Sequence, residues 1–284
     1  MIYVSSSGVR RNTIKETVMF LADNGFRNIE LSGGTHFYPS IEDDLLMLKD
    51  EYGLRYQCHN YFPPPEKDFV VNLASLNDDI YQRSIDHCLN ALNLSGRLGG
   101  RRYGVHAGFF VDVEVTELGK IIVSKALMNK QKAIQRFCEA VRYIRQNSNG
   151  IDIYIENNVL SCSNYQEHGC RNIFMLTSYL DYIELKERLD FKLLLDVAHL
   201  KVSSTTLGFD FNTELDGLLS ESDYIHISDN DGLHDLNQSI EGNSPLCDIL
   251  KSRLVGKDVT LEIYGDISDI KSSYRVIREI VSDS

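Results

Sequence analysis

Eight short apolar segments alternate with longer amphipathic segments along the whole chain of 284 residues. Each apolar segment has four to seven residues and is rich in Ile, Val, Leu or Tyr, a composition typical of strands. The segments between them carry helix-start and helix-stop signals. The expected strands are Ile2–Ser5, Arg27–Leu31, Leu54–Cys58, Arg102–His106, Ile151–Glu156, Phe191–Asp196, Asp223–Ser228 and Asp258–Tyr264.

Eight strands that are each followed by a helix are the element count of a (β/α)8 barrel. The structural alternative is an open, doubly wound sheet, which usually carries a glycine-rich phosphate-binding turn after its first strand. The turn Ser5-Ser6-Ser7-Gly8 does not have that pattern, and no linker, repeat or low-complexity stretch divides the chain. We therefore expect an α/β protein that is a single TIM barrel domain over residues 1–284.

Local signals locate helix starts and long loops. The motif Ser75-x-x-Asp78 resembles a capping box, and Ser244 precedes a proline, which favours the first helical position. Two connections, Asn60–Ala74 and Val159–Asn172, are longer than a minimal barrel needs. Long loops that follow the strands tend to carry function.

Composition excludes several classes of protein. No run approaches the roughly 18–20 consecutive apolar residues of a membrane helix, and the first residues lack a secretory signal. We therefore expect no membrane association and a cytoplasmic location, in which the six cysteines are free thiols. The net charge of −12 disfavours nucleic acid as a partner, because phosphate contacts supply most of such affinity.

The fifth to eighth expected strands each carry an ionisable residue near the C-terminal end. In Ile151-Asp-Ile-Tyr-Ile-Glu156 the isoleucines share one parity and Glu156 has the other, so isoleucines facing the helices leave Glu156 pointing into the barrel. The same alternation points Asp196, His226 and Glu262 inward. These four side chains are expected to meet near the C-terminal end of the barrel.

Three buried carboxylates are unfavourable together unless their charge is compensated. A divalent cation compensates it, and oxygen ligands with one imidazole suit Mn²⁺, Mg²⁺, Co²⁺ or Zn²⁺. The alternative is a set of separately satisfied polar residues or surface ion pairs, which four equivalent strand ends disfavour. The sequence therefore predicts one divalent metal ion (Mn, Co, Mg or Zn) bound by Glu156, Asp196, His226 and Glu262.

Further histidines lie near strand ends. Three fall where they can reach the site: His59, His106 and His199. His87 lies in an expected helix and is interpreted as structural. His36 and His168 lie in expected loops, where contact with a substrate is an open alternative.

The motifs at the strand ends, in this order, are similar to those of a known family. They are Tyr103-Gly-Val-His106-Ala-Gly, Glu156-Asn-Asn, Asp196-Val-Ala-His199, His226-Ile-Ser-Asp229-Asn-Asp231 and Leu261-Glu262. Together they resemble the xylose-isomerase-like barrel superfamily of sugar isomerases, ketose 3-epimerases, inosose dehydratases and endonuclease IV repair enzymes. The resemblance runs from the first expected strand to the last expected helix.

The resemblance implies a metal-dependent sugar or sugar-phosphate isomerase or epimerase of carbohydrate metabolism. Glu156 and Glu262 would remove and return the proton next to a carbonyl, through an enediolate. His199 would hydrogen-bond a substrate hydroxyl, and His59 and His106 would line the pocket. The expected partner is a small sugar or sugar phosphate, and a homodimer is one expectation for the oligomeric state.

One position departs from the epimerase pattern. Many epimerases carry an arginine shortly after the histidine of the seventh strand, whereas the stretch Asp229–His234 contains none. If the chain is an epimerase, stabilisation of the enediolate must then come from the metal or from another residue.

A zinc phosphodiesterase that acts on abasic DNA is the main alternative. The predicted site residues, including His59, His106 and His199, also match metal ligands of the endonuclease IV members. Those members carry an Asp-x-His pair after the seventh strand, and the nearest candidate, Asp235-Leu-Asn237, has asparagine in place of histidine. The third metal site is therefore expected to be incomplete.

Two further alternatives stay open at this point. A metal-dependent sugar dehydratase or lyase begins with the same proton abstraction, and the sequence does not separate it from an isomerase. A barrel that binds a sugar without converting it is the non-catalytic alternative, which loss of tight metal binding would favour.

Overall fold

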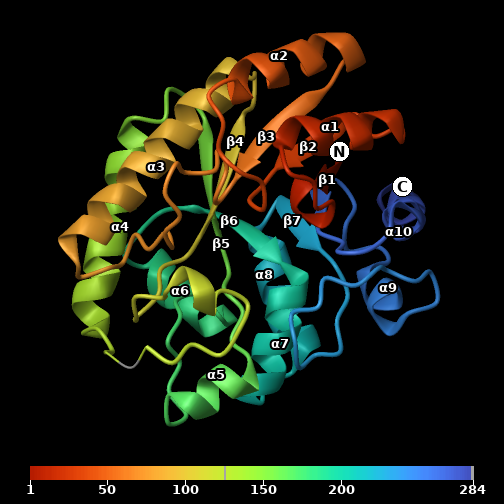
Figure 1. Ribbon diagram of the computed structural model, residues 1–284. Coiled ribbons are helices and arrows are strands. Elements are labelled where there is room, and N and C mark those ends of the chain that lie inside the picture. The colour runs from red at the N-terminus through yellow and green to blue at the C-terminus, as the bar shows by residue number, and fades with distance from the viewer. Residues whose placement is uncertain (125, 283–284) are drawn as a thin grey trace.

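The computed structural model describes residues 1–124 and 126–282 of the chain. Eight parallel strands hydrogen-bond in chain order and close into a barrel, with β8 paired to β1 (Figure 1). The predicted (β/α)8 TIM barrel is confirmed. The strands are β1 Ile2–Ser5, β2 Asn28–Leu31, β3 Arg55–His59, β4 Arg102–His106, β5 Asp152–Glu156, β6 Lys192–Asp196, β7 Tyr224–Ile227 and β8 Asp258–Leu261.

Helices surround the strands (Figure 1). The last helix packs next to the first strands, since the ring centroids of Tyr274 and Phe26 lie 5.3 Å apart. The helices are α1 Ile14–Asp23, α2 Ile41–Tyr52, α3 Asp78–Arg97, α4 Lys130–Gln146, α5 Cys162–Glu167, α6 Tyr179–Lys186, α7 Val197–Leu207, α8 Phe211–Glu221, α9 Pro245–Leu250 and α10 Ile267–Ser282, with short 3-10 turns η1 Ser6–Gly8 and η2 Val115–Glu117.

Strand parity separates two apolar regions. Ile153 and Ile155 of β5 belong to the main core between the strands and the helices, together with the outward-facing residues of the other strands. Tyr154, Leu194 and Tyr224 have the opposite parity and pack against one another as a separate cluster. The alternation that was predicted to point Glu156 inward is thus present in the structure.

The last strand is shorter than expected. We predicted a strand as far as Tyr264, but β8 ends at Leu261. The backbone N–H of Glu262 still donates to Ile227 O at 3.1 Å, so the chain keeps its strand direction for one more residue. Glu262 therefore sits at the end of the barrel.

One predicted capping box is wrong. Asn77, not Ser75, caps α3, because its side chain accepts from the N–H groups of Asp79 and Ile80. Ser75 Oγ instead accepts from the Asn77 N–H at 3.1 Å and shapes the turn before the helix. The start of α9 is confirmed, since Ser244 Oγ accepts from the Cys247 N–H.

The loops at the C-terminal end of the strands differ from the expectation in one respect. The connection after β5 contains the short helix α5, and the connection after β4, described over residues 107–124 and 126–129, is a long loop that the sequence did not single out. No helix in the described part of the chain is long and apolar enough to span a membrane. All six cysteines are free, with Cys162 and Cys170 exposed.

Candidate metal and catalytic site

Four ligand-type side chains meet at the C-terminal end of the barrel. Glu156, Asp196, His226 and Glu262 each offer one atom, and these atoms lie within 4.8 Å of one another. Their side chains are buried, with at most 7% of any of the four residues exposed. The structure therefore brings together all four residues that the sequence predicts as metal ligands.

Three atoms of this cluster have no hydrogen-bond partner. They are Glu156 Oε1, Asp196 Oδ2 and His226 Nδ1. His226 Nδ1 lies 3.4 Å from Glu156 Oε1 and 3.7 Å from Glu262 Oε2. Buried polar atoms are normally paired, and unpaired ones that face one another suit a bound cation. Three carboxylates and one imidazole are a donor set for a divalent metal ion.

Local structure fixes Asp196. It is the last residue of β6 and the N-cap of α7, where Oδ1 accepts the His199 N–H at 2.7 Å. The Asn157 side chain makes two hydrogen bonds to the Asp196 backbone. Asn157 Oδ1 accepts the Asp196 N–H at 2.7 Å, and Asn157 Nδ2 donates to Asp196 O at 3.0 Å. Oδ2 is thereby left free to bind a ligand.

Glu30 is a buried carboxylate that the sequence analysis missed. Its Oε1 lies 3.0 Å from His226 Nε2, and its other oxygen, Oε2, accepts from Gln57 Nε2 at 3.0 Å and from Thr260 Oγ1 at 3.2 Å. It is also hydrogen-bonded to the Tyr224 hydroxyl. A signal was present, because Ile29 and Leu31 share one parity and leave Glu30 pointing inward at the end of its strand.

The three predicted pocket histidines lie beside the cluster. His59 Nε2 is 2.7 Å from Glu156 Oε2, and His106 Nδ1 is 3.2 Å from the same oxygen. His199 Nδ1 contacts Asn157 O at 2.9 Å, and its Nε2 lies 3.5 Å from Asp235 Oδ2. His59, His106 and Glu156 form a further group with metal-ligand spacing.

The remaining predicted histidines lie elsewhere. His87 is buried in α3 with Nε2 3.0 Å from Asn60 O, which agrees with a structural role. His168 caps the end of α5 and its Nε2 contacts Ile122 O at 3.0 Å, so it ties two loops together. His36 is exposed in the loop after β2.

Burial disfavours charge on every carboxylate of the cluster, and the nearby histidines decide the outcome. Burial raises the pKa of Glu156, but the neighbouring imidazoles of His59 and His226 outweigh burial and hold the pKa well below its usual value. Glu262 follows the same balance, in which His226 overcomes burial and lowers the pKa to about 2. For Asp196 burial prevails and raises the pKa to about 7. Glu156 and Glu262 are thus ionised at neutral pH.

The pKa values of the histidines also depend on the balance between burial and nearby carboxylates. Burial lowers the pKa of His226, but Glu30 and Glu262 outweigh it and raise the pKa well above its usual value. For His106 burial outweighs the nearby Glu156 carboxylate and lowers the pKa to about 4. A neutral imidazole both donates and accepts one hydrogen bond, which suits His106 for contact with a hydroxyl group.

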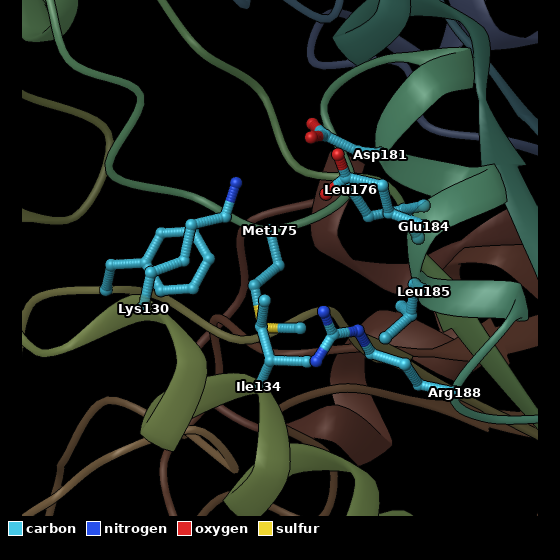
Figure 2. A pocket seen from close by; sticks show the side chains of 9 residues that line it. Lys130, Ile134, Met175, Leu176, Asp181, Glu184, Leu185 and Arg188 are labelled. Carbon is cyan, nitrogen blue, oxygen red and sulfur yellow. The ribbon is translucent and has the colours of Figure 1, made fainter.

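A large cavity opens beside the site, and another, of about 730 Å³, lies at the opposite ends of β5 and β6, where Asp152 and Lys192 line it. A cavity of about 650 Å³ is lined by His106 and His199 and opens at the C-terminal end of the strands. Figure 2 shows a different crevice, between α4 and α6, in which Lys130 and Ile134 face Leu185 and Arg188. That crevice holds about 20 Å³, which is space for little more than one water molecule.

The sequence of the chain matches one family model. Residues 18–279 match the model of the xylose isomerase-like TIM barrel. The chain belongs to this family. No curated protein sequence matches the chain.

Solved structures of sugar epimerases and of an endonuclease share the fold at low sequence identity. A D-tagatose 3-epimerase-like protein is 18% identical with a TM-score of 0.73, covering 98% of this chain and 96% of its own. D-psicose 3-epimerase of Clostridium cellulolyticum is 14% identical with a TM-score of 0.64 and 99% coverage of both chains. Endonuclease IV of Thermus thermophilus is 15% identical with a TM-score of 0.62, covering 100% of this chain and 99% of its own.

Proposed function

We propose that this xylose isomerase-like barrel is a divalent-metal-dependent sugar isomerase or epimerase that moves a proton at a carbon next to a carbonyl. The observation that carries the proposal is the set of unpartnered atoms Glu156 Oε1, Asp196 Oδ2 and His226 Nδ1, with Glu262 beside them. These four residues would hold the ion, which is Mn, Co, Mg or Zn. When bound, it would polarise the substrate carbonyl and acidify the neighbouring C–H.

Two carboxylates are the candidates for proton transfer. Glu262 is ionised at neutral pH, and Ser5 Oγ donates to its Oε1 at 3.2 Å, which fixes the orientation of the carboxylate. Glu156 is also ionised, and its second oxygen contacts His59 Nε2 at 2.7 Å. One of them removes the proton, and the same or the other carboxylate returns it.

The histidines at the mouth would orient the substrate. His106 and His199 line both the polar cluster and the cavity, with ring centroids 5.6 Å apart. His199 is held from behind by Asn157 O, so its Nε2 side faces Asp235 and the cavity. We assign substrate hydroxyl contacts to His106 and His199, and support of Glu156 to His59.

Solvent exchange tests the proposed reaction even where the product has not been identified. The purified chain, loaded separately with Mn²⁺, Co²⁺, Mg²⁺ or Zn²⁺, is incubated with ketoses and ketose phosphates in D₂O. We expect metal-dependent deuterium incorporation at the carbon next to the carbonyl, detected by NMR. Deuterium incorporation in no sugar with any metal would contradict the proposal.

A pair of variants of the eighth strand assigns the proton transfer. Glu262→Gln should lower turnover by about two to four orders of magnitude without unfolding the chain, because it removes an acid–base group. Asp258→Asn is the matched control, since Asp258 lies at the opposite end of β8, where it pairs with Arg102 at 2.5 Å. Near-normal turnover by Glu262→Gln would remove this carboxylate from the mechanism.

A zinc phosphodiesterase is the second candidate function. The group His59, His106 and Glu156 favours it, because it offers a second set of metal ligands beside the first. Asn237, where the resemblance implies a histidine, is buried and accepts from Ser228 Oγ at 3.2 Å. Incision of an abasic duplex by the zinc-loaded chain, together with absence of sugar exchange, would favour this candidate.

A further inference from the structure

The cavity outside the polar cluster is apolar over much of its wall. It begins at His106 and His199 and extends between the loops after β4, β5 and β7. Its apolar lining includes Phe109, Val113, Leu118, Ile121, Ile122, Phe174 and Leu236. A sugar bound at the cluster would therefore have a hydrophobic compartment beside it.

The inner wall of this compartment is held in place by backbone pairing and by buried apolar packing. Phe109 and Phe174 pair through an antiparallel bridge, with ring centroids 5.3 Å apart. They belong to a hydrophobic cluster separate from the main core, which also contains Val113 and Ile122. The loop that carries Ile122 is anchored to α5, because Asn164 Oδ1 accepts the Ile122 N–H at 2.8 Å. The compartment is thus preformed.

The outer rim exposes apolar side chains to solvent. Leu118, Ile121 and Leu236 line the cavity and are 41%, 49% and 41% exposed. Side chains of this kind at the mouth of a cavity mark a ligand site, because their exposure to water is unfavourable until a ligand covers them. The rim and the inner wall form one continuous apolar path to the histidines.

Histidines aside, the charged residues of the described lining are one exposed lysine, Lys120, and two carboxylates, Glu117 and Asp235. Lys120 Nζ donates to Thr116 O at 3.1 Å. The Glu117 carboxylate accepts from the N–H groups of Val123 and Ser124 and from the Ser124 hydroxyl. No arginine occurs among these described residues, and two carboxylates against one lysine disfavour an anionic phosphate group.

We infer that the substrate is a neutral sugar or polyol that carries an apolar substituent, aromatic or aliphatic, which fills this compartment while the sugar lies at the polar cluster. The inference rests on the proposed function and names its substrate class. A volume of about 650 Å³ is that of a site for a drug-sized ligand and leaves room for such a substituent. The apolar path continuous with His106 and His199 gives the substituent its position.

Paired glycosides test the inference by binding. The Mn²⁺-loaded chain is titrated calorimetrically with the methyl and 4-nitrophenyl glycosides of glucose, galactose and xylose. Because an aryl group buries far more apolar area than a methyl group, we expect about ten-fold or tighter binding of the aryl member for at least one sugar. Leu118→Asp and Leu236→Asp should remove this preference.

A matched variant separates an effect on the cavity from the general effect of a new charge on the same loop. Val123 belongs to the same loop and is 61% exposed, but it does not line the cavity, so Val123→Asp should keep the aryl preference. Equal or undetectable binding of both glycosides overturns the inference. A rim that is covered by a second copy of the chain, seen as a dimer that Leu118→Asp dissociates, overturns it as well.

The outcome is distinguishable from failure of the proposed function. Metal-dependent deuterium exchange into unsubstituted ketoses reports on the chemistry alone. Exchange without an aryl preference supports the isomerase proposal but contradicts the inference that the substrate carries an apolar substituent. An aryl preference without exchange in any ketose, unsubstituted or with an aryl group away from its carbonyl, contradicts the isomerase proposal instead.

Discussion

His226 Nε2 is hydrogen-bonded to Glu30 Oε2 at 3.2 Å, while its Nδ1 faces Glu156 and Glu262. When His226 loses one proton to bind a metal, the hydrogen bond to Glu30 keeps the other proton on Nε2 and leaves Nδ1 as the ligand atom. Histidines that bind metals commonly donate their other nitrogen to a carboxylate in this way. The barrel interior thus supplies, from β2, a partner that prepares a ligand on β7.

Removal of the Glu30 carboxylate should weaken metal binding. Because Glu30→Gln takes away the anionic acceptor of His226 Nε2, we expect the metal affinity to fall about 10- to 100-fold with the fold retained. Competition with a fluorescent chelator measures the affinity, and circular dichroism checks the fold. Thr260→Val is the control, since it removes a donor to Glu30 but keeps the pair with His226. Equal affinities of Glu30→Gln and wild type would show that Glu30 does not position the histidine.

Metal affinity should depend on pH. In the metal-free chain burial raises the pKa of Asp196 to about 7, and the carboxylates Glu30 and Glu262 raise the pKa of His226 despite its burial. A metal must displace protons from these groups, so the apparent affinity should fall as the pH is lowered from about 8 to about 6. Calorimetry in two buffers of different ionisation enthalpy should show proton release on binding. An affinity independent of pH, without proton release, would contradict these protonation states.

Packing inside the barrel should make Gly104 intolerant of a side chain. A Cβ at this position would lie 2.8 Å from His59 Cδ2 and 2.9 Å from Leu194 Cδ2. Gly104→Ala should therefore lower the free energy of unfolding by about 1–3 kcal/mol, as measured by urea denaturation.

A glycine on a helix provides the opposite result. Gly96 lies in α3, where a Cβ would meet only Ile151 Cδ1 at 3.5 Å. Gly96→Ala should raise the free energy of unfolding by about 0.5–1 kcal/mol, because alanine favours a helix. If Gly104→Ala is as stable as Gly96→Ala, the described packing around His59 is wrong.

The fold could be predicted from the sequence because two local patterns encode it: the repeat of apolar segments along the chain and the alternation of side chains within each strand. Eight apolar segments set the strand count, and the alternation in residues such as Ile153, Ile155 and Glu156 set which side chains turn inward. Strand ends were less accurate, as in β8, because the last residue of a strand depends on its neighbours in the barrel. The capping error at Ser75 has the same origin, since Asn77 competes for the same helix end.

The site was only partly predictable. The strand-end rule indicated the four residues of the cluster, and the same rule applied to β2 would have indicated Glu30. The clamp of Asn157 on Asp196 depends on backbone positions in two strands, which no local pattern encodes. The apolar cavity was missed because its wall comes from residues 109–122 and from the loops after β5 and β7, which meet only in the folded chain.

The metal content of the purified chain tests the central claim most directly. Untagged protein, prepared without added metal and then incubated with Mn²⁺, Co²⁺, Mg²⁺ or Zn²⁺, is desalted and measured by elemental mass spectrometry. The proposed site predicts one divalent ion per chain, and its loss in Asp196→Asn. Two or three zinc ions per chain would favour the phosphodiesterase instead. A chain that retains no metal under any of these conditions would contradict a metal-dependent enzyme.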